Sequence, residues 1–215
     1  MAIHRRSIIA REGWPYLVVA GSAGIFVWTV WGWPWASPLA LAFVALYFLF
    51  RDPWREVPPE PLGAVAPVDG RIGEVAPYRD PSLPGVWVRV CIDASRLGAY
   101  TVRAPIEGAI HDVADHVMTG DPALAPGGMW LRSEEQHDVI LMFPHGHPAL
   151  GPKAFVRYGE RVGQGQRCAY LRLAPRADVY LPALSRVRVA TGDRVVAGET
   201  ILADLPAQGS GGAPA

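Results

Sequence analysis

Uncharged residues fill the first part of the chain without interruption. From Gly13 to Phe50 there are 38 positions and no charged side chain, too many for one membrane-spanning helix and enough for two short ones. The segment Gly32–Trp35 contains a proline and a glycine and predicts a turn at 32–35. We therefore expect a helical membrane hairpin over 13–50, with spans near Trp14–Trp31 and Ala36–Phe50.

The sequence allows two other interpretations of this segment. A cleavable signal peptide is disfavoured because the apolar run is too long and no small-x-small site precedes a polar start. A buried helical hairpin of a soluble domain is the second alternative.

The orientation of a membrane hairpin follows from the basic residues around it. Arginines at 5, 6, 11, 51 and 55 flank the apolar run on both sides. The basic residues therefore predict an inner (cytoplasmic) membrane protein, with residues 1–12 and the C-terminal domain in the cytoplasm.

Beyond a proline-rich linker at 51–61, the apolar residues come in short runs broken by Gly, Pro and Asp. The segments 86–90 and 186–189 alternate with period two, as half-buried strands do. No later stretch has a helical period over the length of a helix. We expect a mostly β fold, a β-sandwich or barrel-like domain over 62–205, followed by a flexible tail at 206–215.

One sequence repeat supports this architecture. Residues 158–165 and 191–198 share the pattern x-G-(acid)-R-V-x-x-G at an offset of 33, which is typical of a turn, a short strand and a second turn. Such hairpin units occur in lipoyl-type domains, where a lysine carries the cofactor. Lys153 is the only lysine and lies six residues before Gly159, too close for that role, so the repeat is interpreted as architecture.

Charge and cysteine content narrow the choice of partners. The chain has 20 basic and 20 acidic residues, so no net field attracts nucleic acid, and we expect none as a partner. Cys91 and Cys168 are far apart in sequence and predict two buried thiols in a reducing compartment.

Several motifs follow one another in a recognisable order. They are F-R-D-P at 50–53, A-P-V-D-G-R at 66–71, V-R-A-P-I-E-G at 102–108, G-Q-R at 165–167, R-A-D-V-Y-L-P at 176–182 and G-D-R-V-V-A-G-E-T at 192–200. With the hairpin before them, they resemble the short, membrane-anchored phosphatidylserine decarboxylases of bacteria and archaea. The resemblance covers the chain from about Arg11 to Asp204.

This resemblance implies a specific cofactor. Family members carry a pyruvoyl group that forms a Schiff base with the substrate amine. The protein makes the group from the serine of a Gly-Ser bond, which it cleaves with the help of an Asp and a His. In the matching stretch here, Ala174 stands at the glycine position and Pro175 at the serine position. The sequence thus predicts a chain without the pyruvoyl cofactor.

The other processing positions are only partly kept. Tyr100 occupies the position of the histidine, and a tyrosine of ordinary pKa is a poor base at neutral pH. Asp69 matches the family's aspartate; a turn aspartate before Gly70 is the alternative interpretation. Arg103 is a candidate for binding a phosphate or carboxylate, with an ion pair to Glu107 as the alternative. His145 and His147, between two prolines, are interpreted as loop residues, and we expect no metal site.

These observations leave three functions open. The first is a decarboxylase-like membrane protein of phospholipid metabolism that lacks decarboxylase activity. It either still binds membrane phospholipid or pairs with a protein partner, an active decarboxylase or a second copy of itself. The second is an active enzyme that makes phosphatidylethanolamine and has an unrecognised processing site. The third is a structural membrane module that docks a partner.

Overall fold

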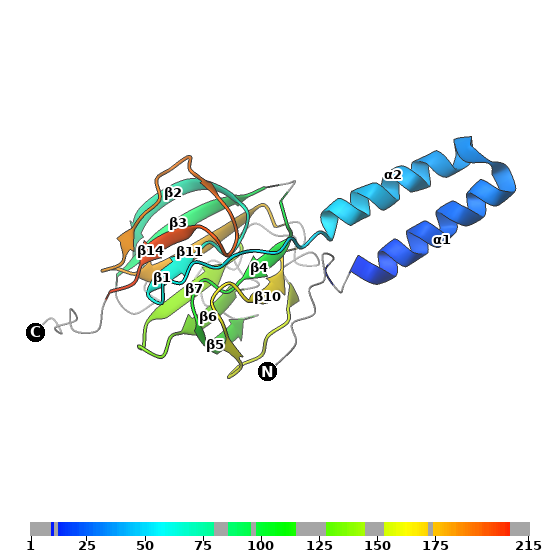
Figure 1. The fold of residues 1–215 in the computed structure, drawn as a ribbon. Coiled ribbons are helices and arrows are strands. Elements are labelled where there is room, and N and C mark those ends of the chain that lie inside the picture. The colour runs from blue at the N-terminus through cyan, green and yellow to red at the C-terminus, as the bar shows by residue number, and fades with distance from the viewer. Residues whose placement is uncertain are drawn as a thin grey trace, which may run out of the picture. The chain divides into compact units, whose positions relative to one another are not determined.

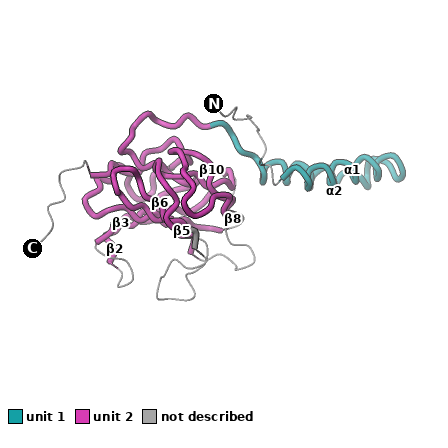
Figure 2. Tube along the Cα trace, turned by 90° about the horizontal axis from the view of Figure 1, so that it is seen from below, with its two compact units in different colours: residues 1–54 teal, residues 55–215 magenta. Residues whose placement is uncertain are grey.

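The computed structural model describes residues 10, 13–79, 86–95, 98–114, 128–144, 153–171 and 174–206. The chain divides into two compact units, Met1–Trp54 and Arg55–Ala215, drawn in separate colours in Figure 2. We describe each unit by itself.

The first unit is a helical hairpin of α1 (Trp14–Trp31) and α2 (Trp33–Leu49), which run side by side in opposite directions (Figure 1). Gly32 alone separates them, with a φ of 82° that glycine adopts without strain. The second helix therefore begins inside the stretch in which the sequence predicted the turn. Pro34 lies in its first turn, where the missing N–H costs no hydrogen bond.

The surface of this hairpin is apolar on all sides. Within the two helices only Leu17 and Ala36 are buried, whereas large apolar side chains such as Phe26, Trp28 and Leu41 are at least 59% exposed. Helix α1 is long and apolar enough to cross a membrane, at about 27 Å for 18 residues; α2 is apolar but shorter, with 17 residues. An apolar surface around the whole helix is typical of membrane segments.

The second unit confirms the mostly β prediction (Figure 1). Its described residues form fourteen strands in three sheets. The largest sheet has the order β13 (Arg194–Val195), β2 (Gly70–Tyr78), β3 (Trp87–Ala94), β11 (Arg176–Pro182), β7 (Asp138–Met142), β6 (Gly128–Arg132), β5 (Gly108–Ala114), β9 (Arg161–Val162). The small sheets are β1 (Gly63–Val65), β14 (Ile201–Asp204), β12 (Arg186–Val187) and β4 (Thr101–Arg103), β10 (Arg167–Tyr170), β8 (Lys153–Ala154).

The strand order has an internal two-fold character. From the centre of the large sheet outward, β11 corresponds to β7, β3 to β6, β2 to β5 and β13 to β9, and the two small sheets correspond to each other. The half that holds β4 to β10 is therefore inserted in the chain between β3 and β11 of the other half. The segments A-P-V-D-G at 66–70 and A-P-I-E-G at 104–108 stand at equivalent places, 38 residues apart.

Backbone hydrogen bonds join the two halves reciprocally at these segments. The N–H of Val65 donates to the carbonyl of Pro105 (2.8 Å), and the N–H of Arg103 donates to the carbonyl of Pro67 (2.9 Å). Each donor and its counterpart differ by the same 38 positions. The two halves are thus joined by their own equivalent segments as well as by the β11–β7 pair of the large sheet.

The repeat at 158–165 and 191–198 forms the predicted turn, strand and turn. Gly192 donates its N–H to Ile72 (2.7 Å), as Gly159 donates to Ile110 (2.8 Å). The four glycines that the two copies share, at 159, 165, 192 and 198, have φ between 70° and 94°, which is the reason for glycine at these places. Both repeats extend the large sheet, one at each edge.

One hydrophobic cluster lies between the sheets. Its largest fully buried members come from both halves and are Ile72, Ile92, Ile106, Ile110, Met129, Leu131, Leu141, Leu171, Leu181 and Leu202. A second, smaller cluster on the large sheet contains Trp87, Ile140, Met142 and Tyr180.

We expect the equivalent glycines Gly70 and Gly108 to tolerate no side chain. A Cβ atom at Gly70 would lie 2.2 Å from the carbonyl oxygen of Asp93, and one at Gly108 would lie 2.2 Å from that of Arg132. Each alanine variant should lower the melting temperature of the β domain by roughly 2–12 °C, the cost of overpacking in a domain of this size. Gly163→Ala is the matched control, because its Cβ would meet Gln166 at an ordinary 3.7 Å; melting of the control at an equally low temperature would contradict the steric explanation.

Candidate functional site

Asp69 lies between the buried Val68 and strand β2, and its carboxylate is the centre of a hydrogen-bond network. Oδ1 accepts the N–H of Ala197 at 2.8 Å, and Oδ2 accepts that of Ala99 at 3.0 Å. Nη2 of Arg55 lies 3.1 Å from Oδ1 and 2.8 Å from Oδ2. Each oxygen thus accepts two hydrogen bonds, which fills the capacity of an ionised carboxylate.

The groups around Asp69 come from distant parts of the chain. Ala99 lies in the connection from β3 to β4, Ala197 in the turn from β13 to β14, and Arg55 in the segment that follows the helical hairpin. The carboxylate therefore ties three segments to the start of β2. The sequence left open a turn aspartate before Gly70 as the alternative to a processing residue, and the contacts with these three segments extend beyond such a turn.

Arg103 ends β4 and binds a backbone group. Its Nη1 donates to the carbonyl of Gly165 at 3.0 Å, and its side chain passes Gly198, where a Cβ would lie 2.9 Å from Cδ. Glu107, the ion-pair partner considered from sequence, is exposed. Arg103 thus lies between the two equivalent glycine turns, on the same side of Gly198 as Arg55.

Ala174 and Pro175 immediately precede β11. Ala174 is buried and Pro175 is exposed. The carbonyl of Pro175 accepts the N–H of Ala94 at 2.8 Å, and the next residue, Ser95, donates its N–H to the carbonyl of Asp69 at 2.8 Å. Two consecutive residues at the end of β3 therefore connect Pro175 to Asp69.

Tyr100 belongs to the same neighbourhood. Its carbonyl accepts the N–H of Leu171 at 2.7 Å, and the carbonyl of Leu171 accepts the N–H of Ala174 at 3.2 Å. The ring of Tyr100 lies 6.5 Å from that of Tyr170, centroid to centroid. The structure thus gathers Asp69, Tyr100, Ala174 and Pro175, which are up to 106 positions apart, into one continuous hydrogen-bonded region.

A polar pair on β11, next to this region, was not predicted from the sequence. Arg176 holds Asp178, with Nε 2.7 Å from Oδ1 and Nη2 3.1 Å from Oδ2. Asp178 is 3% exposed.

Both cysteines of the chain are buried. Burial, reinforced by the nearby Asp178, raises the pKa of the Cys91 thiol to about 11. Burial also raises the pKa of the Cys168 thiol, to about 12, so both native cysteines are protonated and unreactive at neutral pH.

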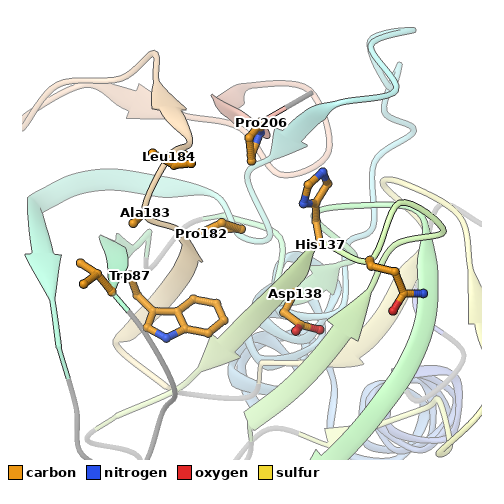
Figure 3. Close-up of a pocket in the computed structure, with 9 residues that line it drawn as sticks. Trp87, His137, Asp138, Pro182, Ala183, Leu184 and Pro206 are labelled. Carbon is orange, nitrogen blue, oxygen red and sulfur yellow. The ribbon is translucent and has the colours of Figure 1, made fainter. Parts of the chain in front are cut away.

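A shallow cavity of about 300 Å³ lies at the opposite end of the large sheet, lined by Val86, Trp87, Gln136, His137, Asp138, Pro182, Ala183, Leu184 and Pro206 (Figure 3). Trp87 pairs with Pro182, whereas Asp93 pairs with Arg176. Six residue steps of about 3.3 Å put this cavity about 20 Å from the region around Pro175. None of the site residues predicted from sequence lines it.

No cluster of three or more His, Cys, Asp or Glu that could hold a metal ion occurs among the residues whose structure is described. The histidines at 145 and 147 lie outside the described residues.

Comparison with known proteins gives the family. The chain is 34% identical over 209 residues to a phosphatidylserine decarboxylase proenzyme of Aromatoleum aromaticum, covering 93% of this chain and 96% of that protein. It is 34% identical over 206 residues to a proenzyme of the same name from Nitrosomonas europaea (92% and 95%) and 33% identical over 211 residues to one from Burkholderia mallei (94% and 97%). The chain belongs to the phosphatidylserine decarboxylase family.

Two other comparisons add little. No family model matches the sequence. Glucose permease IIA from Mycoplasma capricolum aligns with a TM-score of 0.45 and 14% identity over 66% of this chain and 94% of that chain.

Proposed function

We propose that this chain is a membrane protein of the phosphatidylserine decarboxylase family that forms no pyruvoyl group and does not decarboxylate phosphatidylserine. The observation that carries the proposal is Ala174-Pro175 at the position of the Gly-Ser bond. Proline has no hydroxyl, so its side chain can neither attack the preceding carbonyl nor be converted to pyruvoyl. The residues present therefore do not fit the group.

The surroundings of Asp69 support the same proposal. A processing aspartate must be free to orient or accept from a histidine, but here Tyr100 stands at the histidine position. Asp69 already accepts hydrogen bonds from Ala99, Ala197 and Arg55. Its ion pair and its place in the network suit a structural residue rather than a base.

The remaining features favour a role at the membrane. The apolar helix α1 supports membrane association, and the family acts on a phospholipid, so membrane phospholipid is the ligand we propose. A second copy of this chain or an active decarboxylase is the proposed protein partner. An active enzyme with another cleavage site is the outcome that the first experiment below would reveal.

We expect the purified protein to remain one chain with the mass of the full sequence, 23.3 kDa. Denaturing mass spectrometry should show this species alone, and vesicles containing phosphatidylserine should release no CO₂ above a protein-free blank. A fragment of about 41 residues beginning at 175, or any pair of fragments with a blocked new N-terminus, would establish the active alternative.

Restoring the processing residues should restore self-cleavage. We expect a slow appearance of the 175–215 fragment in the triple variant Tyr100→His, Ala174→Gly, Pro175→Ser. Pro175→Ser alone should cleave about 10²–10⁴-fold more slowly, because it lacks the histidine base. The matched control carries Pro175→Ala in place of Pro175→Ser and should never cleave. A triple variant that melts like the parent yet stays intact for days would show that the region has lost more than these side chains.

We further propose that both ends of the hairpin face the cytoplasm, as the basic residues around it predict. In intact cells, Trp33→Cys should react with an impermeant thiol reagent, and Gln208→Cys should react only after lysis. Cys91 and Cys168 are buried and provide the low background. Equal labelling of the two introduced cysteines before lysis would reject this topology.

A further inference from the structure

The segment 55–63, which joins the helical unit to the first strand, is fastened to the β domain at three places. Arg55 binds Asp69, Val57 packs on Gly165, and the side chain of Gln164 binds carbonyls near the end of the segment. A linker between two units needs none of these contacts to connect them. We call residues 55–63 the strap.

The first fastening point is an ion pair shielded from solvent. Nη2 of Arg55 lies 2.8 Å from Oδ2 of Asp69, and the two side chains are 16% and 13% exposed. Nη1 of Arg55 lies 3.8 Å from Oε1 of Glu199, in the connection between β13 and β14. A pair this well covered is screened less by water and salt than pairs on the open surface.

The second and third points depend on shape and on backbone groups. Gly165 has a φ of 70°, and a Cβ on it would lie 2.3 Å from Cγ2 of Val57, so the strap approaches this turn as closely as glycine permits. The amide nitrogen of Gln164 donates to the carbonyls of Glu60 and Gly63. Both contacts fix the strap to the inserted half of the domain.

The strap therefore joins the two halves. Gly165 and Gly198 are equivalent positions of the repeat, 33 residues apart. Val57 contacts the turn at Gly165, and Cβ of Arg55 lies 3.8 Å from where a Cβ of Gly198 would be. Two residues of the strap thus each lie against a glycine turn, and these two turns occupy equivalent positions in the two halves of the domain.

We propose that Arg55 and Asp69 form a latch that closes the strap over both halves of the β domain, starting one residue after the helical unit ends. This role does not need the processing chemistry. Asp69 is present although the histidine and serine positions hold Tyr100 and Pro175. With the latch closed, the chain enters the β domain at a fixed point beside Asp69. Opening it frees the strap from the turns at 165 and 198 without unfolding the sheets. This proposal holds whether or not the chain is cleaved at 175.

The latch can be tested with a glutamate-specific protease acting on the full chain in nanodiscs. Glu56 is exposed, and the Glu56–Val57 bond lies inside the strap. Arg55→Gln and Asp69→Asn should each speed cleavage at this bond by about tenfold or more, since each removes hydrogen bonds to a charged partner. Arg89→Gln is the matched control; it removes an arginine–carboxylate pair with Glu74 outside the strap and should leave the rate within about twofold.

Combining the substitutions decides between a latch and separate effects. In the double variant Arg55→Gln, Asp69→Asn, cleavage should be no faster than in either single variant, because both remove the same contact. Fully multiplied effects, or parental cleavage in Arg55→Gln, would overturn the latch. Cleavage spread over the whole β domain would assign the pair a global stabilising role instead. Should Asp69→Asn melt early, Arg55→Gln decides, because Asp69 then still accepts from Ala99 and Ala197.

Discussion

Outside the β11–β7 pair of the large sheet, the two halves of the β domain are joined by a reciprocal contact, the exchange of backbone hydrogen bonds between 65–67 and 103–105. The same pattern of small residue, proline, apolar residue, acid and glycine makes both sides of this contact. Proline offers only its carbonyl, and each proline uses it to accept from the other half. Glycine follows because the next strand starts against a neighbouring carbonyl, at Asp93 in one half and Arg132 in the other.

The two halves differ most at the acid of this pattern. Glu107 is exposed, whereas Asp69, its counterpart, is mostly covered and binds Arg55 and two backbone N–H groups. The shorter side chain of Asp69 reaches the amides of Ala99 and Ala197 directly. Its negative charge is balanced by Arg55 of the strap, which lies outside the two equivalent halves. The duplicated architecture thus puts an acidic residue at the same position in each half. The contact with Arg55 of the strap distinguishes Asp69 from Glu107.

Much of this was visible in the sequence, and the part that was not has a physical reason. The uncharged run at 13–50 predicted both helices, and short alternating runs predicted a mostly β domain, because periodicity reports burial directly. The repeat at 158–165 and 191–198 predicted turns that the structure confirms. The relation between 66–70 and 104–108 was equally visible but was not identified as a repeat. Pairings such as Arg55 with Asp69 lie beyond any local pattern, since they depend on how three connections meet in space.

The geometry also explains why the fold tolerates a proline at 175, where the family resemblance implies a serine. Pro175 is exposed and precedes β11, so its missing N–H removes no bond of the sheet, and its carbonyl still accepts from Ala94. Tyr100 contributes its carbonyl to Leu171, a contact that any residue could make. Asp69 is different, because replacing it would strand the guanidinium of Arg55 and two amide donors in a covered site. The three positions that the family resemblance assigns to processing therefore carry unequal structural costs in this chain, and the aspartate, whose loss would cost most, matches the residue that the resemblance implies.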